Sequence, residues 1–220
     1  MADGSNAPLI VGIGGTTVAG SSNERALVLA LEAARSAGLR TRLFGGEALA
    51  ALPLYVPCLS DRTSGEHDLV AAVREASGII IASPGYHGGV SGLVKNAIDL
   101  IEETARDPRP YLDNLPVGLI ATAYGWQATG STIAGLRAIV HALRGWPTPF
   151  AAAVNSAVCR FDAEGGCSEA AVAEQLALVG RQVADAVLRD ARRVSHWCTS
   201  GLVNTTPLRA FASNSPEVHQ

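Results

Sequence analysis

An α/β fold, with a parallel sheet covered by helices on both faces, is the fold class that the sequence predicts. Five short apolar runs, each typical of a buried strand, alternate along the chain with segments of helical periodicity. Right-handed crossover connections leave few topologies for such a sheet. The chain has 220 residues, 48% of them hydrophobic and 17% charged, which favours one domain with a sizeable core.

The predicted strands are rich in apolar residues, as expected where helices cover both faces of a sheet. The first, LIVGI, and the third, III, contain only apolar residues and glycine, whereas the second alternates apolar and polar side chains. The fourth, VGLIA, and the fifth, PFAAAV, are again apolar. In chain order the predicted strands are residues 9–13, 39–44, 79–81, 117–121 and 149–154.

The predicted helices place apolar residues three and four positions apart. The first has Leu27, Leu31 and Ala34 on one face and ends at Gly38. The last carries a long apolar face that is mostly valine. Three prolines within residues 106–116 predict a loop. In chain order the predicted helices are residues 23–37, 69–76, 91–104, 131–143 and 168–194.

Composition and charge exclude several classes of partner. The net charge is −3, and no basic stripe or polybasic cluster points to nucleic acid or to an anionic membrane. No stretch approaches the roughly 18 apolar residues of a membrane span. The first residues, MADGSNAPLIVGIGG, lack the cationic start and long apolar run of a signal peptide. We therefore expect a cytoplasmic protein.

The cysteines indicate no metal site. Cys58, Cys159, Cys167 and Cys198 form no C-x-x-C pair, and no histidine stands near them at a zinc-like spacing. A disulfide between Cys159 and Cys167 is conceivable, but free thiols are the expectation for a cytosolic enzyme.

The loop after the first strand has the features of a phosphate site. In parallel α/β sheets ligands bind at the carboxyl ends of the strands. Residues 14–25, GGTTVAGSSNER, supply the hydroxyls of Thr16, Thr17, Ser21 and Ser22, and Asn23 or Ser22 is the expected helix cap. A helix N-terminus with unpaired N–H groups suits an anion. The dinucleotide pattern G-x-G-x-x-G and the P-loop are both absent, and an ordinary capped turn is the alternative.

The loop after the third strand suits a flat aromatic ligand. Gly85, Gly88 and Gly89 allow the backbone to approach a ligand without a Cβ in the way. Pro84 stiffens the exit from the strand, and Tyr86 and His87 project from the turn. For His87 we expect a hydrogen-bonding or stacking role rather than a general acid.

The loop after the fourth strand exposes two aromatic residues. Residues 122–131, TAYGWQATGS, start at Thr122 and place Tyr124 and Trp126 on either side of Gly125. Exposed aromatic rings are costly unless a ligand or a partner subunit covers them. Packing of these rings against the neighbouring helix is the alternative.

These residues together resemble the NADPH-dependent FMN reductase family. The family motif Gly-Ser-x-Arg with a serine three residues on corresponds to Gly15-Thr16-Thr17-Val18 and Ser21. Its second motif, Pro-Glu-Tyr-Asn-Gly, corresponds to PGYHG at residues 84–88, followed by the helix start GLVKNAID at residues 92–99. The turn LRGW at residues 143–146 is similar to the exit from the family's fourth helix.

The resemblance implies a flavodoxin-like three-layer sandwich. Its five-stranded parallel sheet would have the order 2-1-3-4-5, within an FMN-binding domain of residues 1–195 and before a C-terminal tail of residues 196–220. It also implies three groups of FMN-binding residues. They are Thr16, Val18, Ser21, Ser22 and Asn23 for the phosphate, Pro84, Gly85, Tyr86, His87 and Gly88 for the ribityl chain and ring, and Thr122, Tyr124, Gly125 and Trp126 beside the isoalloxazine.

The chain departs from the family pattern at three of these positions. Val18 stands in place of the motif arginine, Gly85 in place of a glutamate and His87 in place of an asparagine. Loss of the arginine removes a charge-assisted phosphate contact. The expected consequences are looser FMN binding, a different flavin, or compensation by another arginine such as Arg25.

The implied function is NAD(P)H-dependent flavin reduction, in which a hydride passes from the nicotinamide to the flavin. The cofactor supplies the reactivity and the protein supplies positioning, so no catalytic side chain is assigned. The alternatives are an FMN-bound quinone or azo reductase and a non-enzymatic flavin-binding electron carrier. The resemblance also implies a homodimer or homotetramer, and a monooxygenase is a plausible recipient of reduced flavin. The choice between NADPH and NADH stays open.

Overall fold

A parallel sheet forms the centre of the fold. The structure, a computed structural model, describes residues 7–162 and 165–199. The main path of the sheet runs in the order β2-β1-β3-β5-β6. These strands are β1 (Leu9–Gly14), β2 (Arg40–Phe44), β3 (Gly78–Tyr86), β5 (Pro116–Ala123) and β6 (Trp146–Asn155). All four contacts between them are parallel, so the predicted strand order is confirmed.

A sixth strand corrects the predicted count of five. The two-residue β4 (Gly89–Val90) pairs antiparallel with the end of β3. A strand of two residues has no periodicity that a sequence pattern can show. This strand matters because its hairpin with β3 carries Tyr86 and His87.

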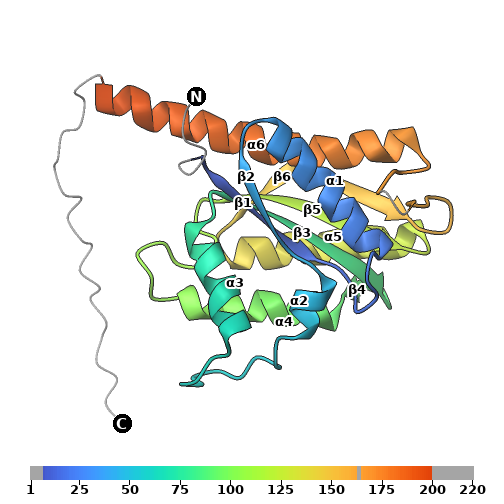
Figure 1. Ribbon diagram of the computed structural model, residues 1–220, viewed down its shortest axis with the longest axis horizontal. Coiled ribbons are helices and arrows are strands. Elements are labelled where there is room, and N and C mark those ends of the chain that lie inside the picture. Colours follow the sequence, from blue (N-terminus) through green and yellow to red (C-terminus); the bar gives the residue numbers. More distant parts are fainter. Residues whose placement is uncertain (1–6, 163–164, 200–220) are drawn as a thin grey trace, which may run out of the picture. The chain divides into compact units, whose positions relative to one another are not determined.

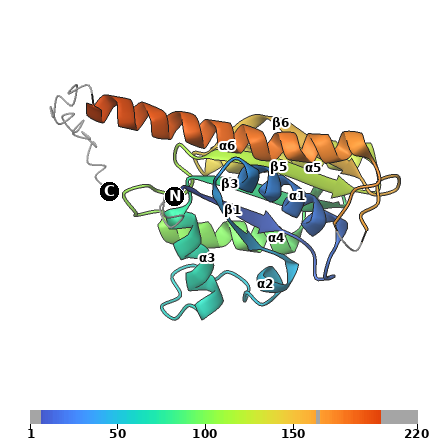
Figure 2. The ribbon, with the colours of Figure 1, turned by 45° about the horizontal axis from the view of Figure 1, so that its top comes forward.

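Helices cover both faces of the sheet (Figures 1 and 2). On one face lie α1 and α6, and on the other lie α3, α4 and α5. The helices are α1 (Ser22–Ser36), α2 (Gly46–Ala50), α3 (Ser64–Glu75), α4 (Gly92–Asp99), α5 (Trp126–Ala142) and α6 (Ala170–Thr199), with the 3₁₀ helix η2 (Leu100–Thr104) after α4. The predicted helices are present, and the short α2 was not predicted. In the described residues no helix combines the length and the hydropathy that a membrane span needs.

The chain separates into two units, Met1–Leu188 and Arg189–Gln220. The first unit contains the whole sheet. The second begins within α6, and its described part continues that helix to Thr199. The predicted boundary at residue 195 therefore falls inside α6, and residues 200–220 of the predicted tail lie outside the described residues.

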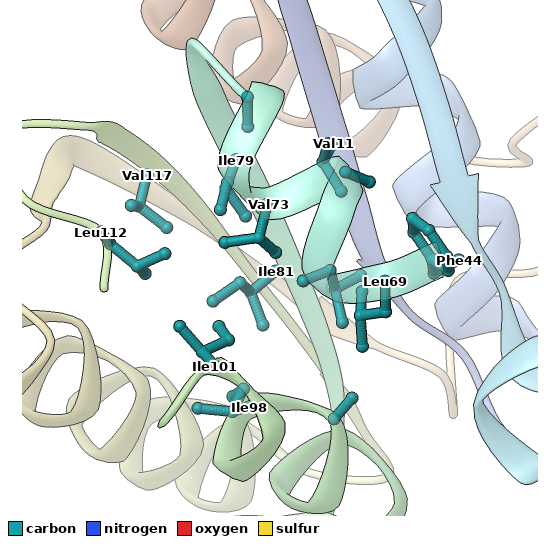
Figure 3. Close-up of a cluster of buried hydrophobic side chains, with 14 of the residues drawn as sticks. Val11, Phe44, Leu69, Val73, Ile79, Ile81, Ile98, Ile101, Leu112 and Val117 are labelled. Atoms are coloured by element: carbon teal, nitrogen blue, oxygen red, sulfur yellow. The ribbon is translucent and has the colours of Figure 1, made fainter. Parts of the chain in front are cut away.

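Two apolar cores follow from the alternation of side chains along the strands. Val11, Ile79 and Ile81 point to the face covered by α3 and α4, where they meet Leu69 and Val73 (Figure 3). The intervening residues of the same strands point to the other face. They are Ile10, Ile80 and Ala82, and they pack with side chains of α1 and α6. This packing fixes the carboxyl ends of β1, β3 and β5 along one edge of the sheet.

Candidate functional site

A cavity of about 390 Å³ lies where the carboxyl ends of β1, β3 and β5 meet. Its walls come from the three loops that the sequence singled out, together with the end of β6. The lining residues are Thr16, Val18, Ser21, Ser22, Asn23, Pro84, Gly85, Tyr86, His87, Thr122, Ala123, Tyr124 and Ser156. Ala123 and Ser156 were not predicted, and the predicted Gly88, Gly125 and Trp126 are not among the lining residues. Nothing in the sequence pointed to Ser156 as a site residue, because it follows β6, and the residues at the end of that strand include no cluster of glycines or hydroxyls.

The first loop turns sharply before α1 begins. Ser21 is the N-cap of α1, and its side chain accepts a hydrogen bond from the Glu24 N–H at 3.4 Å. The expected caps, Ser22 and Asn23, are instead the first two residues of the helix. The Thr16 hydroxyl accepts a hydrogen bond from the Val18 N–H at 3.1 Å. Hydroxyls of this loop therefore face the cavity beside the N-terminus of a 15-residue helix.

Asn23 joins the first loop to the third. Its side chain is buried, its Oδ1 accepts from the Gly15 N–H at 2.9 Å, and its Nδ2 donates to the Thr122 hydroxyl at 3.1 Å. Both ends of the amide are thus bonded to protein groups. Asn23 therefore lines the cavity, and its amide joins the wall formed by the first loop to the wall formed by the end of β5.

The second loop is a tight hairpin between β3 and β4. Tyr86 pairs with Gly89, and the two residues between them, His87 and Gly88, have φ values of 53° and 81°. Positive φ at both central positions is the pattern of a type I′ turn, whose twist matches that of the flanking strands. Behind the turn, the buried Ser83 hydroxyl donates to the Pro84 carbonyl at 2.9 Å and accepts from the Ser91 N–H at 3.0 Å. The hairpin presents exposed Tyr86 and His87 side chains on a fixed base.

Gly85 is required by the packing of α5 on β3. A Cβ built at this position would lie 2.7 Å from the Thr132 Oγ1 and 3.0 Å from the Ala128 carbonyl oxygen. The carbonyl belongs to the helix backbone, so a larger residue would force α5 away from the strand. In this chain, therefore, only glycine fits without a shift at the position where the family motif has glutamate.

The third loop is shorter than predicted. Thr122 is buried at the end of β5, and Tyr124 is 78% exposed beside the cavity. Trp126 is the first residue of α5 rather than part of the loop, which corrects the predicted helix start at residue 131. The N-cap, Gly125, makes no side-chain capping hydrogen bond, so the sequence contains no capping signal at this point.

The cavity lining is neutral. None of its residues is an aspartate, glutamate, lysine or arginine, and His87 is its one basic side chain. Within the described part of the chain no cluster of histidine, cysteine or acidic residues has the form of a metal site. Its polar side chains are mostly hydroxyls, and its largest apolar surfaces are the rings of Tyr86 and Tyr124. Such a lining is suited to orient a planar ligand and holds no pair of acidic and basic side chains.

The three cysteines whose side chains the structure describes lie outside this lining. Cys58, Cys159 and Cys167 are free, as expected, and the Cys159 and Cys167 sulfurs are 3.3 Å apart. Burial, together with the neighbouring Cys167, raises the pKa of the Cys159 thiol to about 11. The Cys198 side chain lies outside the described residues.

The chain is similar in sequence and in fold to known proteins. Residues 8–158 match the model of the NADPH-dependent FMN reductase family. The FMN-dependent NADPH-azoreductases of Staphylococcus haemolyticus (strain JCSC1435) and Staphylococcus aureus (strain USA300) are each 31% identical over 93 residues, which are 42% of this chain and 46% of the relative. The matched segment thus spans about half the length of these curated relatives.

Solved structures share the fold at low identity. The NAD(P)H:(acceptor) oxidoreductase FerB from Paracoccus denitrificans has a TM-score of 0.64 at 18% identity, with 83% of this chain and 98% of that chain covered. A flavodoxin, WrbA-like protein from Agrobacterium tumefaciens has a TM-score of 0.58 at 16% identity, with 83% and 98% covered. The apo form of the NADH:FMN oxidoreductase EmoB has a TM-score of 0.61 at 22% identity, with 80% and 88% covered.

The family match and the fold lead to the same conclusion. The matched residues 8–158 are more than half of the chain and contain all three loops of the cavity. The sheet order, the helices on both faces and the similar solved structures make the fold flavodoxin-like. The chain belongs to the NADPH-dependent FMN reductase family.

Proposed function

We propose that this protein is an NAD(P)H-dependent flavin reductase that binds FMN in the cavity at the carboxyl edge of the sheet. One observation carries the proposal. Hydroxyls at a helix N-terminus and a glycine-containing hairpin with exposed tyrosine line a single cavity of about 390 Å³, within the usual range for small-molecule sites of roughly 300–1,000 Å³. An anionic tail and a planar ring are the two chemical features that such a lining accommodates.

The lining fits FMN group by group. Thr16, Ser21 and Ser22 would hold the phosphate, with the first N–H groups of α1. Residues Pro84 to His87 would line the ribityl chain and the ring, and Thr122 to Tyr124 would border the isoalloxazine. When bound, FMN supplies the ring system that accepts a hydride from the nicotinamide.

The side chains of this site position and shield rather than react. Tyr86 and Tyr124 offer aromatic surface that orients stacked rings and limits the access of water. Backbone N–H groups of the hairpin are suited to stabilise negative charge that develops on the ring. The reactivity belongs to the flavin, and we propose a hydrogen-bonding or stacking role for His87, the one basic side chain of the lining, so we assign no general acid or base.

Consumption of NADPH and NADH by the purified full chain tests the proposal. We expect oxidation of at least one nicotinamide nucleotide that depends on FMN, measured by loss of absorbance of the reduced nucleotide. A matched pair of variants localises the reaction: Tyr86→Ala in the cavity should raise the apparent KM for flavin, and Tyr111→Ala, outside the lining, should leave it unchanged. Absence of oxidation with both nucleotides in excess FMN would contradict the proposal.

An FMN-bound quinone or azo reductase is the second candidate. It is supported by the names of the curated relatives, which are FMN-dependent NADPH-azoreductases. Tightly held FMN would then pass electrons to a second substrate in ping-pong order. Yellow protein after gel filtration, with parallel lines in double-reciprocal plots, favours this candidate, whereas release of FMN favours the flavin reductase. Rapid steady-state nucleotide consumption excludes a non-enzymatic electron carrier.

We further propose a cytoplasmic homodimer or homotetramer, which would cover the exposed Tyr124 and Trp126 rings. A monooxygenase that receives reduced flavin is the proposed physiological partner. Light scattering during gel filtration tests the oligomeric state, and a monomer at micromolar concentration would contradict it.

A further inference from the structure

Two cysteine thiols lie in contact in the segment between β6 and α6. The sulfurs of Cys159 and Cys167 are 3.3 Å apart, although the two residues stand eight positions apart along the chain. Both cysteines are free, and neither lines the cavity. A disulfide bond is about 2.05 Å long, so only a small approach of the two sulfurs separates this contact from a covalent bond.

Backbone hydrogen bonds beside the pair hold the two halves of this segment together. The carbonyl of Arg160, the neighbour of Cys159, accepts from the Ser168 N–H at 2.9 Å, and the Arg160 N–H donates to the Ser168 hydroxyl at 3.0 Å. Phe161 and Cys167 form an antiparallel bridge. The fold therefore keeps the two thiols close to each other, which gives them a high effective concentration for reaction.

The two thiols differ in how easily a solute reaches them. Cys159 is 1% exposed, and burial together with the neighbouring Cys167 raises the pKa of its thiol to about 11. At neutral pH the Cys159 thiol is thus protonated and shielded. Cys167 is only half-buried. An oxidant reacts first at the accessible thiol of such a pair, and the adjacent thiol then converts the product to a disulfide.

We propose that Cys159 and Cys167 form a reversible oxidation site, at which hydrogen peroxide converts the two thiols to a disulfide. One oxygen of the peroxide passes to the Cys167 sulfur, which becomes a sulfenic acid, and a water molecule leaves. The Cys159 sulfur then attacks the Cys167 sulfur, so that the S–S bond forms and the S–O bond breaks. The hydroxyl leaves with the Cys159 proton as a second water, and a dithiol reductant restores both thiols.

The disulfide would close a short loop directly after a wall of the cavity. Asn155 is the last residue of β6, Ser156 lines the cavity, and the Cys159 N–H donates to the Asn155 carbonyl at 2.9 Å. A crosslink restricts the unfolded chain more than it restricts a loop that hydrogen bonds already hold. We therefore expect oxidation to raise the midpoint of thermal unfolding by about 5–10 °C.

A non-reducing peptide map of the full chain after treatment with hydrogen peroxide tests the inference. We expect peptides joined through Cys159 and Cys167, which dithiothreitol separates. Cys167→Ser should abolish both the linked peptides and the rise in the thermal midpoint, which circular dichroism measures. Cys58→Ser is the matched control, because Cys58 is an exposed free cysteine outside the pair, and it should change neither result.

The assigned roles have a test of their own. Without its partner thiol, the oxidised Cys167 of Cys159→Ser should stop at the sulfenic acid, which dimedone labels. In Cys167→Ser, the shielded Cys159 should take up no label. Circular dichroism checks that both variants fold, and the half-buried position of residue 167 makes Cys167→Ser the safer of the two.

Several outcomes would overturn the inference. One is peroxide-treated protein without a Cys159–Cys167 disulfide, and another is a disulfide from either residue to Cys58, because the pairing would not then follow the contact in the fold. Dimedone labelling of Cys159 rather than Cys167 would overturn the assigned roles. A linked pair with a lower thermal midpoint would show that the bond forms only by distorting the loop. Flavin binding enters none of these measurements, so the proposed function is tested separately.

Discussion

At the scale of single residues, a buried amide joins two walls of the cavity. The Asn23 side chain accepts from the Gly15 N–H and donates to the Thr122 hydroxyl, two residues on different strand ends. Position along the sequence suggested a helix cap or a phosphate donor for Asn23. One of its two partners, Thr122, is 99 residues away, so a local pattern could not indicate that bond. Thr16, Ser21 and Ser22 were predictable as lining residues because they stand together in one loop at the end of a predicted strand.

We predict that Asn23→Ala lowers the free energy of unfolding by about 1–3 kcal/mol, because it leaves the buried Gly15 N–H without a partner. Thr122→Val, which removes only the hydroxyl, should cost less. In a double-mutant cycle measured by urea unfolding, the two changes together should cost less than their sum. Strict additivity would show that the Asn23–Thr122 hydrogen bond contributes nothing to the free energy of unfolding. The flavin affinity of the folded variants would show whether the walls of the site have separated.

At the scale of elements, α1 and α6 approach each other so closely that one helix has glycine at the contact. A Cβ on Gly180 would lie 2.0 Å from the Ala30 carbonyl oxygen and 3.0 Å from the Ala33 Cβ. No rotamer change relieves a contact with backbone, so the helices would have to move apart. This pair of helices forms one outer layer, and α1 also carries the first loop at its N-terminus.

Gly180→Ala should therefore destabilise the protein by about 1–3 kcal/mol, the usual cost of overpacking a buried contact. Gly130→Ala is the matched control, since Gly130 lies in α5 and a Cβ at that position would have nothing within 4 Å. That change should stabilise by about 0.5–1 kcal/mol, because alanine loses less backbone entropy than glycine in a helix. Urea unfolding followed by circular dichroism measures both, and equal effects of the two substitutions would refute the close contact of α1 with α6.

The sequence predicted the elements whose residues show either a helical period or an unbroken apolar run. The buried strands 79–81 and 117–121 were evident because a sheet covered on both faces needs apolar residues throughout. The start of α5 was misplaced because Gly125 offers no capping side chain, and β4 was missed because two residues show no period. The strand order came from the family resemblance, and pairing between strands confirmed it.

At the scale of the whole molecule, charge contributes to stability mainly at one buried network. The Arg35–Glu32 pair is typical of the surface, with side chains 59% and 49% exposed, and pairs of this kind contribute little. The Arg62–Glu66 pair differs, because its side chains are only 4% and 2% exposed. Arg62 also bonds Glu103 at 2.7 Å, and its guanidinium lies 4.9 Å from the Tyr55 ring centroid. The network thus joins the segment before α3 to α3 and η2.

This network predicts how the stability of the molecule depends on pH. Burial acts to raise the pKa of Glu66, but hydrogen bonds from the Thr63 N–H, the Thr63 hydroxyl and Arg62 outweigh it and hold the pKa below its ordinary value of 4.5. A carboxyl whose pKa is depressed by folding stabilises the native state at pH values above the unfolded pKa. That contribution is lost as the pH falls through the folded pKa. The loss should therefore lie below about pH 4.5.

Glu66→Gln should lower the free energy of unfolding by about 3 kcal/mol at pH 7, because it removes one partner of a buried pair. The difference between the natural chain and the variant should shrink as the pH falls below about 4.5 and through the lowered pKa of folded Glu66. Glu32→Gln, which breaks the exposed pair with Arg35, should change stability by no more than about 0.5 kcal/mol at any pH. Urea unfolding at a series of pH values measures all three proteins. A constant Glu66→Gln difference across this range would show that ionisation of Glu66 plays no part in holding the first unit together.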